Sequence, residues 1–137
     1  MILLDTNVVS ELVKPSPDGK VASWFILNAD EAALTSVVIG ELAYGIAKLP
    51  EGRRRSRLEA QLAEWRARFV DRTYAYGVTA AMIYGDIQGD AFRTGRAIAA
   101  PDAQIAAIAL EHGALIATRD IADFRDRGVD LVNPWEA

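Results

Sequence analysis

The stretch MILLDTNVVSEL, residues 1–12, decides the fold. The apolar residues Ile2–Leu4 predict a short buried strand, and the polar residues 5–7 follow that strand at once. An apolar run with helical spacing then resumes over Val8–Val13. In open parallel α/β sheets, functional sites form beyond the carboxyl ends of the strands. A strand that ends in a carboxylate and leads directly into a helix therefore favours a parallel sheet with a site at its edge.

Short apolar segments alternate with helical patterns along the rest of the chain. Further strands are predicted over residues 32–35, 71–75, 115–118 and 131–133. Helices are predicted over residues 18–28, 36–48, 53–69, 78–92 and 101–113, with a short helical turn over 121–124. Asp18 and Ser36 are expected to be the N-caps of two of these helices. Residues expected on the apolar face of helix 18–28 are Val21, Trp24, Phe25 and Leu27.

This alternation predicts an α/β fold with one domain over residues 1–137. Four or five short strands would form a central parallel sheet, with helices on both faces. The length of 137 residues also suits one domain.

Composition narrows the setting in which the protein works. The chain has no cysteine, which excludes disulfides and thiolate metal sites and suits a reducing compartment. The sequence has no pattern typical of a signal peptide, and no apolar stretch approaches the roughly 20 residues that span a bilayer. We therefore expect a cytoplasmic protein without membrane contact.

The net charge is −4, but residues 48–72 contain eight Lys or Arg against four Asp or Glu, so one basic helical region lies on an acidic body.

Four acidic residues from separate parts of the sequence are expected at one edge of the sheet. Asp5 follows the first strand, and Glu41 lies on the second turn of the helix after the second strand. Asp102 lies in the first turn of the helix before the fourth strand, and Asp120 follows that strand. Because the carboxyl ends of parallel strands meet at one edge, the four side chains are predicted to lie near one another.

A cluster of carboxylates predicts a divalent cation. Without a cation, the mutual repulsion would keep some of the acids protonated. Oxygen ligands without His or Cys suit Mg²⁺ or Mn²⁺, and such an ion can activate water and stabilise an in-line displacement at phosphorus. The pattern therefore predicts phosphodiester hydrolysis. Taken singly, Asp5, Asp102 and Asp120 could equally cap or stabilise helix N-termini.

These motifs resemble the PIN-domain ribonucleases, especially the VapC and FitB-like toxins of bacterial toxin–antitoxin pairs. The resemblance rests on residues 1–12, on SVVIGELAYGIAKLP at 36–50, on AAPDAQIAAIALEHGALIATRDIADF at 99–124 and on VNPW at 132–135. It covers essentially the whole chain. It implies a PIN fold and a Mg²⁺- or Mn²⁺-dependent endoribonuclease toxin that cleaves RNA. It also implies a cognate antitoxin, and a homodimer or a higher toxin–antitoxin assembly.

The resemblance assigns roles to named residues. It implies that Asp5, Glu41, Asp102 and Asp120 are the catalytic, metal-binding acids. Many members carry Asn at the position of Asp120, so Asp123 is the alternative fourth acid, or a residue that braces the turn beneath the metal. Further residues expected to orient the carboxylates or bind a metal-bound water are Thr6, Asn7, Ser36 and Thr118.

Two other functions remain open from the sequence. A receiver-like, Mg²⁺-binding signalling domain shares the parallel sheet but needs an adjacent acidic pair after the first strand and a lysine near the last. This chain has Asp5-Thr6-Asn7, and its lysines are at positions 14, 20 and 48. A PIN-like domain kept only as a binding module is the second alternative. The basic run GRRRSR at 52–57 is either a solvated helix start or a contact for RNA phosphates.

Overall fold

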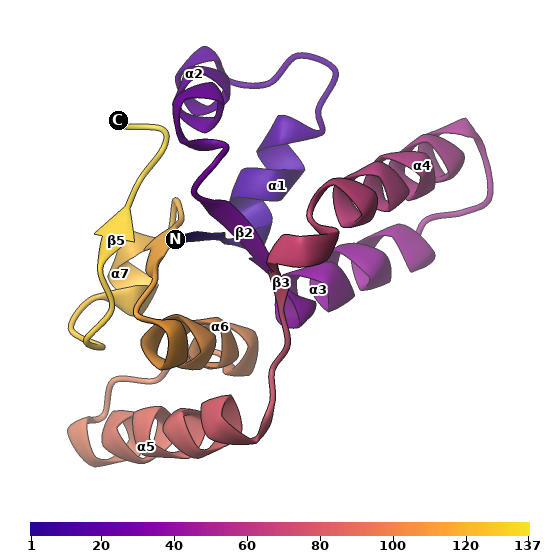
Figure 1. The fold of residues 1–137 in the computed structure, drawn as a ribbon. Helices are drawn as coiled ribbons and strands as arrows, with labels where there is room; N and C mark the ends of the chain where they lie inside the picture. Colours follow the sequence, from indigo (N-terminus) through magenta and orange to yellow (C-terminus); the bar gives the residue numbers. More distant parts are fainter.

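The computed structural model describes residues 1–137 and contains one sheet of five parallel strands (Figure 1). The strand order is β3-β2-β1-β4-β5. The strands are β1 (Ile2–Leu4), β2 (Ala32–Thr35), β3 (Thr73–Tyr74), β4 (Leu115–Ala117) and β5 (Leu131–Val132). The predicted parallel α/β architecture is confirmed. The first strand along the chain lies at the centre of the sheet, so the residues after β1 are flanked on both sides.

Seven α-helices surround the sheet. They are α1 (Thr6–Leu12), α2 (Gly19–Asn28), α3 (Ser36–Ala47), α4 (Arg53–Arg68), α5 (Val78–Thr94), α6 (Ala100–His112) and α7 (Ile121–Phe124), with a 3₁₀ helix η1 at Val70–Arg72. Figure 1 shows α1 and α2 above the sheet, α5 and α6 below it, and the α3–α4 pair extending to one side. No helix combines the length and the apolar character needed to cross a lipid bilayer.

The core lies on both faces of the central strands. Leu3 and Leu4 on β1 and Ile116 on β4 are completely buried, as expected for parallel strands that are covered by helices on each side. The middle of α6, residues 105–109, is also completely buried. The short apolar runs of the sequence therefore form the buried core that supports the loops after β1 and β4.

The helix caps differ in one place from the prediction. Asp18 caps α2 as expected, and its carboxylate accepts hydrogen bonds from the next helical amides. At α3 the cap is Thr35, whose hydroxyl accepts a hydrogen bond from the Val38 amide at 3.2 Å. The predicted cap, Ser36, is wrong by one residue. Ser36 is instead the first helical residue, and its hydroxyl accepts a hydrogen bond from the Tyr76 amide at 3.0 Å.

One residue on the predicted apolar face of α2 and the length of β3 differ from the prediction. The sequence predicts Leu27 on the apolar face of α2, but this side chain is 84 % exposed. The buried positions of this helix are Val21, Trp24 and Phe25, and it is Asn28, not Leu27, that continues their i, i+3, i+4, i+7 spacing. The strand predicted over residues 71–75 is reduced to Thr73–Tyr74, because the 3₁₀ turn of η1 takes up the preceding residues.

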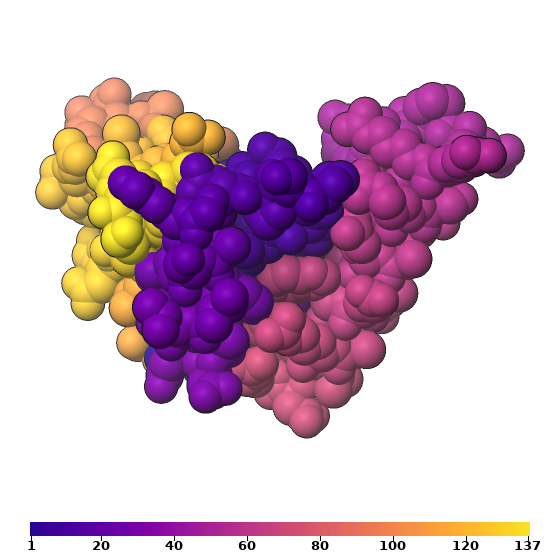
Figure 2. Space-filling view, turned by 90° about the horizontal axis from the view of Figure 1, so that it is seen from above, coloured from indigo at the N-terminus to yellow at the C-terminus, as the bar shows by residue number.

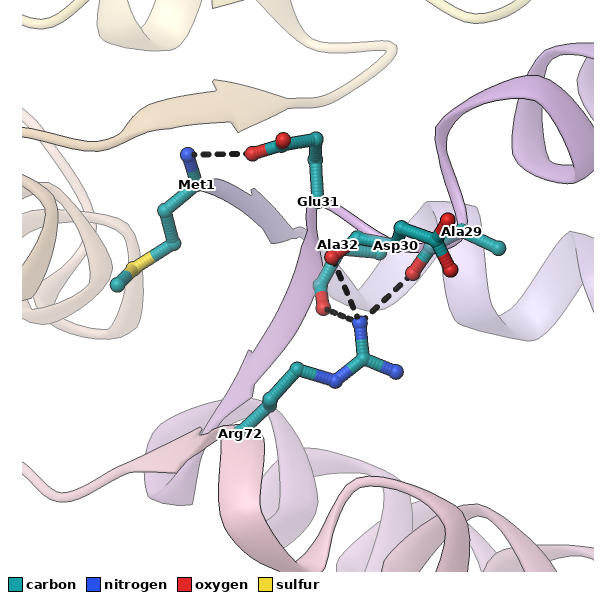
Figure 3. A network of polar contacts seen from close by, with 6 residues as sticks. All are labelled: Met1, Ala29, Asp30, Glu31, Ala32 and Arg72. Atoms are coloured by element: carbon teal, nitrogen blue, oxygen red, sulfur yellow. Dashed lines mark hydrogen bonds and ion pairs between the residues drawn. The ribbon is translucent and has the colours of Figure 1, made fainter.

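Arg72, which follows the C-terminal end of α4, contacts the loop between α2 and β2 (Figure 3). Its guanidinium lies 4.7 Å from the centre of the Phe69 ring. One of its nitrogens donates hydrogen bonds to the carbonyls of Ala29, Asp30 and Ala32, at 2.7, 3.2 and 2.9 Å. In the same loop, Glu31 pairs with the amino group of Met1 at 3.2 Å. These contacts hold the start of β2 in place beside β1.

Candidate functional site

The four predicted acids come from elements that end or begin at the carboxyl edge of the sheet. Asp5 directly follows β1 and is the N-cap of α1, and Asp120 follows β4 and is the N-cap of α7. Glu41 lies on α3, the helix after β2, and Asp102 lies in the first turn of α6. Because β1 pairs in parallel with both β2 and β4, residues distant in the sequence are brought to one edge.

Asp5 is the most buried of the acids, with 4 % of its surface exposed. Thr118, which follows β4, donates a hydrogen bond from its hydroxyl to Oδ2 of Asp5 at 2.7 Å. The backbone amide of Thr6 donates to Oδ1 at 2.8 Å, and the Asn7 amide group donates to Oδ2 at 3.2 Å. Three donors therefore fix the orientation of this carboxylate, and all three favour its ionised form.

Asn7 connects the acids that follow β1 and β4. Its side-chain nitrogen also donates to Oδ2 of Asp120 at 3.0 Å, so one amide group contacts two carboxylates. Its side-chain oxygen accepts a hydrogen bond from the Arg119 amide at 3.3 Å. The Thr118 hydroxyl accepts from the Asp120 amide at 3.0 Å. The loop after β4 is thus held against the start of α1.

Thr6 connects Asp5 to the third acid. Its hydroxyl donates a hydrogen bond to Oε1 of Glu41 at 2.7 Å, while its backbone amide contacts Asp5. A single residue therefore positions one carboxylate from the end of β1 and one from the middle of α3. Thr6, Asn7 and Thr118 therefore all donate hydrogen bonds to carboxylates of the cluster.

Asp102 belongs to the same cluster electrostatically. Burial, followed by the negative charges of nearby acids, raises the pKa of Asp102 to about 6. Those acids are, in order of effect, Asp5, Asp123, Glu41 and Asp120. Burial also raises the pKa of Asp5, against the hydrogen bonds from Thr118 and Thr6, and the charges of Glu41 and Asp120 add to the increase. None of these acids forms an ion pair with a basic side chain. The cluster carries negative charge that the chain itself does not balance.

Two predicted supporting residues lie differently. Ser36 is bonded to the connection between β3 and α5 through the Tyr76 amide, and it donates to none of the carboxylates. Asp123 is exposed, and α7 has no side-chain cap, so no hydrogen bond supports the bracing role considered for Asp123. Its charge acts on Asp102 more strongly than the charges of Glu41 and Asp120 do. Asp123 therefore lies beside the cluster as a further acid.

The spacing of the acids limits how a metal ion could be bound. With the side chains placed as they are in the structure, no group of three or more Asp, Glu or His residues is close enough together to hold a metal ion by itself. The single histidine, His112, lies at the far end of α6, where its ring centre is 4.7 Å from that of Tyr74. The donors at the site are therefore oxygen atoms only.

The structure also contains a feature that the sequence did not predict. A groove with a volume of about 510 Å³ opens beside Thr6 and Glu41, between α1 and the α3–α4 pair. Figure 2 shows the corresponding hollow between the N-terminal part of the chain, in indigo, and the α3–α4 pair, in magenta. The basic run at 52–57 indicates some of the residues near this groove. The position of that run relative to α1 depends on the tertiary fold, so the sequence alone does not predict the groove.

Comparison with known proteins assigns the chain to a family. The family model of the PIN domain matches residues 2–129. The chain is 38 % identical over 138 residues to VapC ribonuclease Y4jK of Sinorhizobium fredii, covering 99 % of both chains. It is 36 % identical to toxin FitB of Neisseria gonorrhoeae, covering 98 % of this chain and 99 % of that one. The crystal structure of FitAcB from Neisseria gonorrhoeae superposes with a TM-score of 0.90 at 35 % identity, covering 100 % of both chains. The chain therefore belongs to the PIN-domain family, in the group that contains the VapC and FitB toxins.

Proposed function

We propose that this protein is a metal-dependent endoribonuclease and the toxin of a toxin–antitoxin pair. The observation that carries the proposal is the cluster of carboxylates from four distant parts of the sequence at the carboxyl edge of the parallel sheet, without a basic partner. Relatives named as a VapC ribonuclease and as a toxin support RNA as the substrate and toxicity as the role.

The residues proposed to hold the cation are Asp5, Glu41, Asp102 and Asp120, with Asp123 as the alternative fourth acid. The donor set fits Mg²⁺ or Mn²⁺, because Mg²⁺ binds through one or two carboxylates and keeps several of its waters. Acids that do not converge as a closed cage can therefore share one hydrated ion, some directly and some through water. When bound, the ion would supply the charge that activates a water and stabilises an in-line displacement at phosphorus.

The chain's own polar residues prepare the acids for this role. The hydrogen bonds from Thr118 and from the Thr6 amide favour the ionised form of Asp5 and oppose the burial that raises its pKa. The Thr6 hydroxyl sets the orientation of Glu41, and Asn7 sets that of Asp120 relative to Asp5. Such supporting contacts fix the geometry of metal ligands and tune their affinity.

The partners of the proposed toxin are a cognate antitoxin and a second copy of this chain. An arginine or lysine of an antitoxin would find unpaired carboxylates at the site and could form charge-assisted hydrogen bonds with them. A second copy would cover an exposed apolar stripe on α5, formed by Val78, Met82, Gly85, Gly89 and Phe92. Interfaces between identical subunits are more apolar than the rest of the surface.

Membership of the PIN-domain family argues against the receiver-like alternative and leaves the non-catalytic binding module as the competing function. Both are separated from the proposed nuclease by incubating the purified protein with RNA in Mg²⁺ or in EDTA. We expect cleavage with Mg²⁺ and none with EDTA. RNA that stays intact in both would favour the binding module, and equal cleavage in both would refute a metal-dependent reaction.

The same assay tests the central acid. Asp5→Asn keeps the shape and the size of the side chain but removes its negative charge from the surroundings of the cation. We expect this variant to lose cleavage and to keep the circular dichroism spectrum of the original chain. Metal-dependent cleavage by the variant at the original rate would remove Asp5 from the proposed site.

A further inference from the structure

The groove beside the acidic cluster has an apolar floor that runs between α1 and α4. Thr6 and Glu41 line one end, so the groove opens directly from two residues of the proposed site. The apolar residues that line it are Val9, Val13, Leu42, Ile46, Leu58, Leu62 and Trp65. An RNA strand with one phosphate at the proposed metal site would therefore continue along this apolar floor.

The charges along the groove are mostly positive and partly unpaired. Arg54 and Arg57 line its wall on α4, and neither forms an ion pair. By contrast, Arg55 pairs with Glu59 at 3.0 Å and does not line the groove. The only acidic residue among those that line the groove is Glu41, at the end that belongs to the acidic cluster.

Both arginines are placed to act on one ligand. They are three residues apart on α4, so they project from neighbouring turns of the same helix face. Arg57 donates a hydrogen bond to the Gln61 side chain at 3.3 Å, and Gln61 donates to the Val13 carbonyl at 3.0 Å. This chain of contacts crosses from α4 to α1 and restrains Arg57 at the groove before any ligand binds.

We infer that this groove binds the single-stranded RNA segment next to the cleaved bond, and that Arg54 and Arg57 are positioning residues for its phosphates. This inference rests on the proposed function. RNA is favoured over an acidic protein segment because the groove begins at the carboxylates where the cleaved phosphate must lie. An apolar floor flanked by unpaired arginines also suits bases and a charged backbone, as in other grooves for single strands.

The test measures the affinity of Asp5→Asn protein for a short fluorescein-labelled oligouridine at several salt concentrations. Oligouridine serves as the probe because phosphate contacts do not depend on sequence. We expect Arg54→Gln and Arg57→Gln each to weaken binding about three- to tenfold and to lower the slope of log affinity against log salt by about 0.7. In the active chain, the same substitutions should raise KM and leave kcat within about twofold.

Arg53→Gln is the matched control, because Arg53 is the exposed neighbour of Arg54 and does not line the groove. We expect it to change the affinity and the salt slope less than either test substitution. An equal loss with Arg53→Gln would mean that only general surface charge matters, and this would overturn the inference. Unchanged affinity in all three variants would also overturn it and would leave the groove for a protein partner. If the original chain does not cleave RNA, the proposed function fails, whereas the salt slope still tests the groove.

Discussion

Asp102 makes the stability of the metal-free protein depend on pH. Its pKa is about 6 in the fold, against an ordinary value of 3.8, because of burial and the surrounding acids. The folded state therefore binds this proton more tightly than the unfolded state does. The stability that the protonated form contributes is complete below about pH 4 and is lost as the pH rises through about 6. At neutral pH, an ionised Asp102 destabilises the fold unless a cation is present.

Asp102→Asn tests the direction of this pH dependence of stability. The variant imitates the protonated acid at every pH, so in EDTA we expect it to melt at a higher temperature than the original chain at pH 8. The difference should disappear near pH 4. Thermal melts in EDTA across this range measure it, with Glu64→Gln as a control because Glu64 is exposed and unpaired on α4. A difference that does not change with pH would contradict the shifted pKa.

Asp120 and Asp123 are separated by their contacts. Asp120 accepts a hydrogen bond from Asn7, which also contacts Asp5, whereas Asp123 has no such contact. We expect Asp120→Ala to reduce cleavage severely and to reduce the rise in melting temperature on adding Mg²⁺. Asp123→Ala should change the free energy of unfolding by less than about 0.5 kcal/mol, as exposed substitutions usually do. Cleavage rates and metal titrations with melts give the answer, and the reverse pattern would make Asp123 the fourth acid.

Much of the candidate site could be predicted from the sequence, because its residues directly follow strands. Asp5, Thr6 and Asn7 follow β1, and Thr118 follows β4, so the parallel pairing alone brings them together. The direction of a hydroxyl is harder to predict. Thr35 and Ser36 can both cap a helix, and the one left over is free to bond elsewhere. The influence of Asp123 on Asp102 depends on how α7 packs against α6, which no local pattern contains.

Among the elements, η1 and the loop before β2 are joined by one side chain. Arg72→Met keeps most of the length of the side chain but removes the donors to three carbonyls and the cation over Phe69. We expect the free energy of unfolding to fall by about 1.5–3 kcal/mol, as for other hydrogen bonds to charged groups. Urea unfolding measures the loss. Arg66→Met, an exposed change on α4, is the control, and an equal loss there would refute a special role for Arg72.

Strand and helix boundaries could be predicted where a polar residue interrupts an apolar run. β1 and β2 have the predicted bounds, and the α2 cap is Asp18 as expected. The order β3-β2-β1-β4-β5 could not be predicted, because short buried parallel strands carry no signal for their neighbours. The three carbonyls that Arg72 contacts lie at least 40 residues away in the sequence, beyond any periodic pattern.

At the scale of the whole molecule, an aromatic stack sets the position of the α3–α4 pair. The Trp65 ring on α4 lies 5.3 Å from Phe69 in a stacked arrangement and 5.5 Å from Phe25 on α2. Phe25 and Phe69 are buried, so the base of α4 is part of the core while its arginine-rich start lies further out. The width of the groove between α1 and α4 therefore depends on core packing as well as on surface residues.

The outer face of α5 is the surface at which we expect the proposed dimer to form. Val78, Met82 and Phe92 are 83, 71 and 89 % exposed, and Gly85 and Gly89 lie between them at alternating spacings of four and three residues. The opposite face of α5 packs on α6. A Cβ added at Gly85 would meet no atom within 4 Å, so the packing of a single chain does not require this glycine. Because glycine has no side chain, this position allows a second helix to approach closely.

Met82→Glu is therefore expected to convert a dimer into a monomer, because it places a charge in the middle of the apolar stripe. Sedimentation velocity at micromolar concentration measures the mass, and the circular dichroism spectrum should not change, since Met82 is exposed in the single chain. Thr79→Glu is the control, because Thr79 is exposed on α5 but lies off the stripe. We expect Thr79→Glu to remain dimeric. A monomeric original chain, or a dimer that persists with Met82→Glu, would show that α5 is not the surface at which two copies meet.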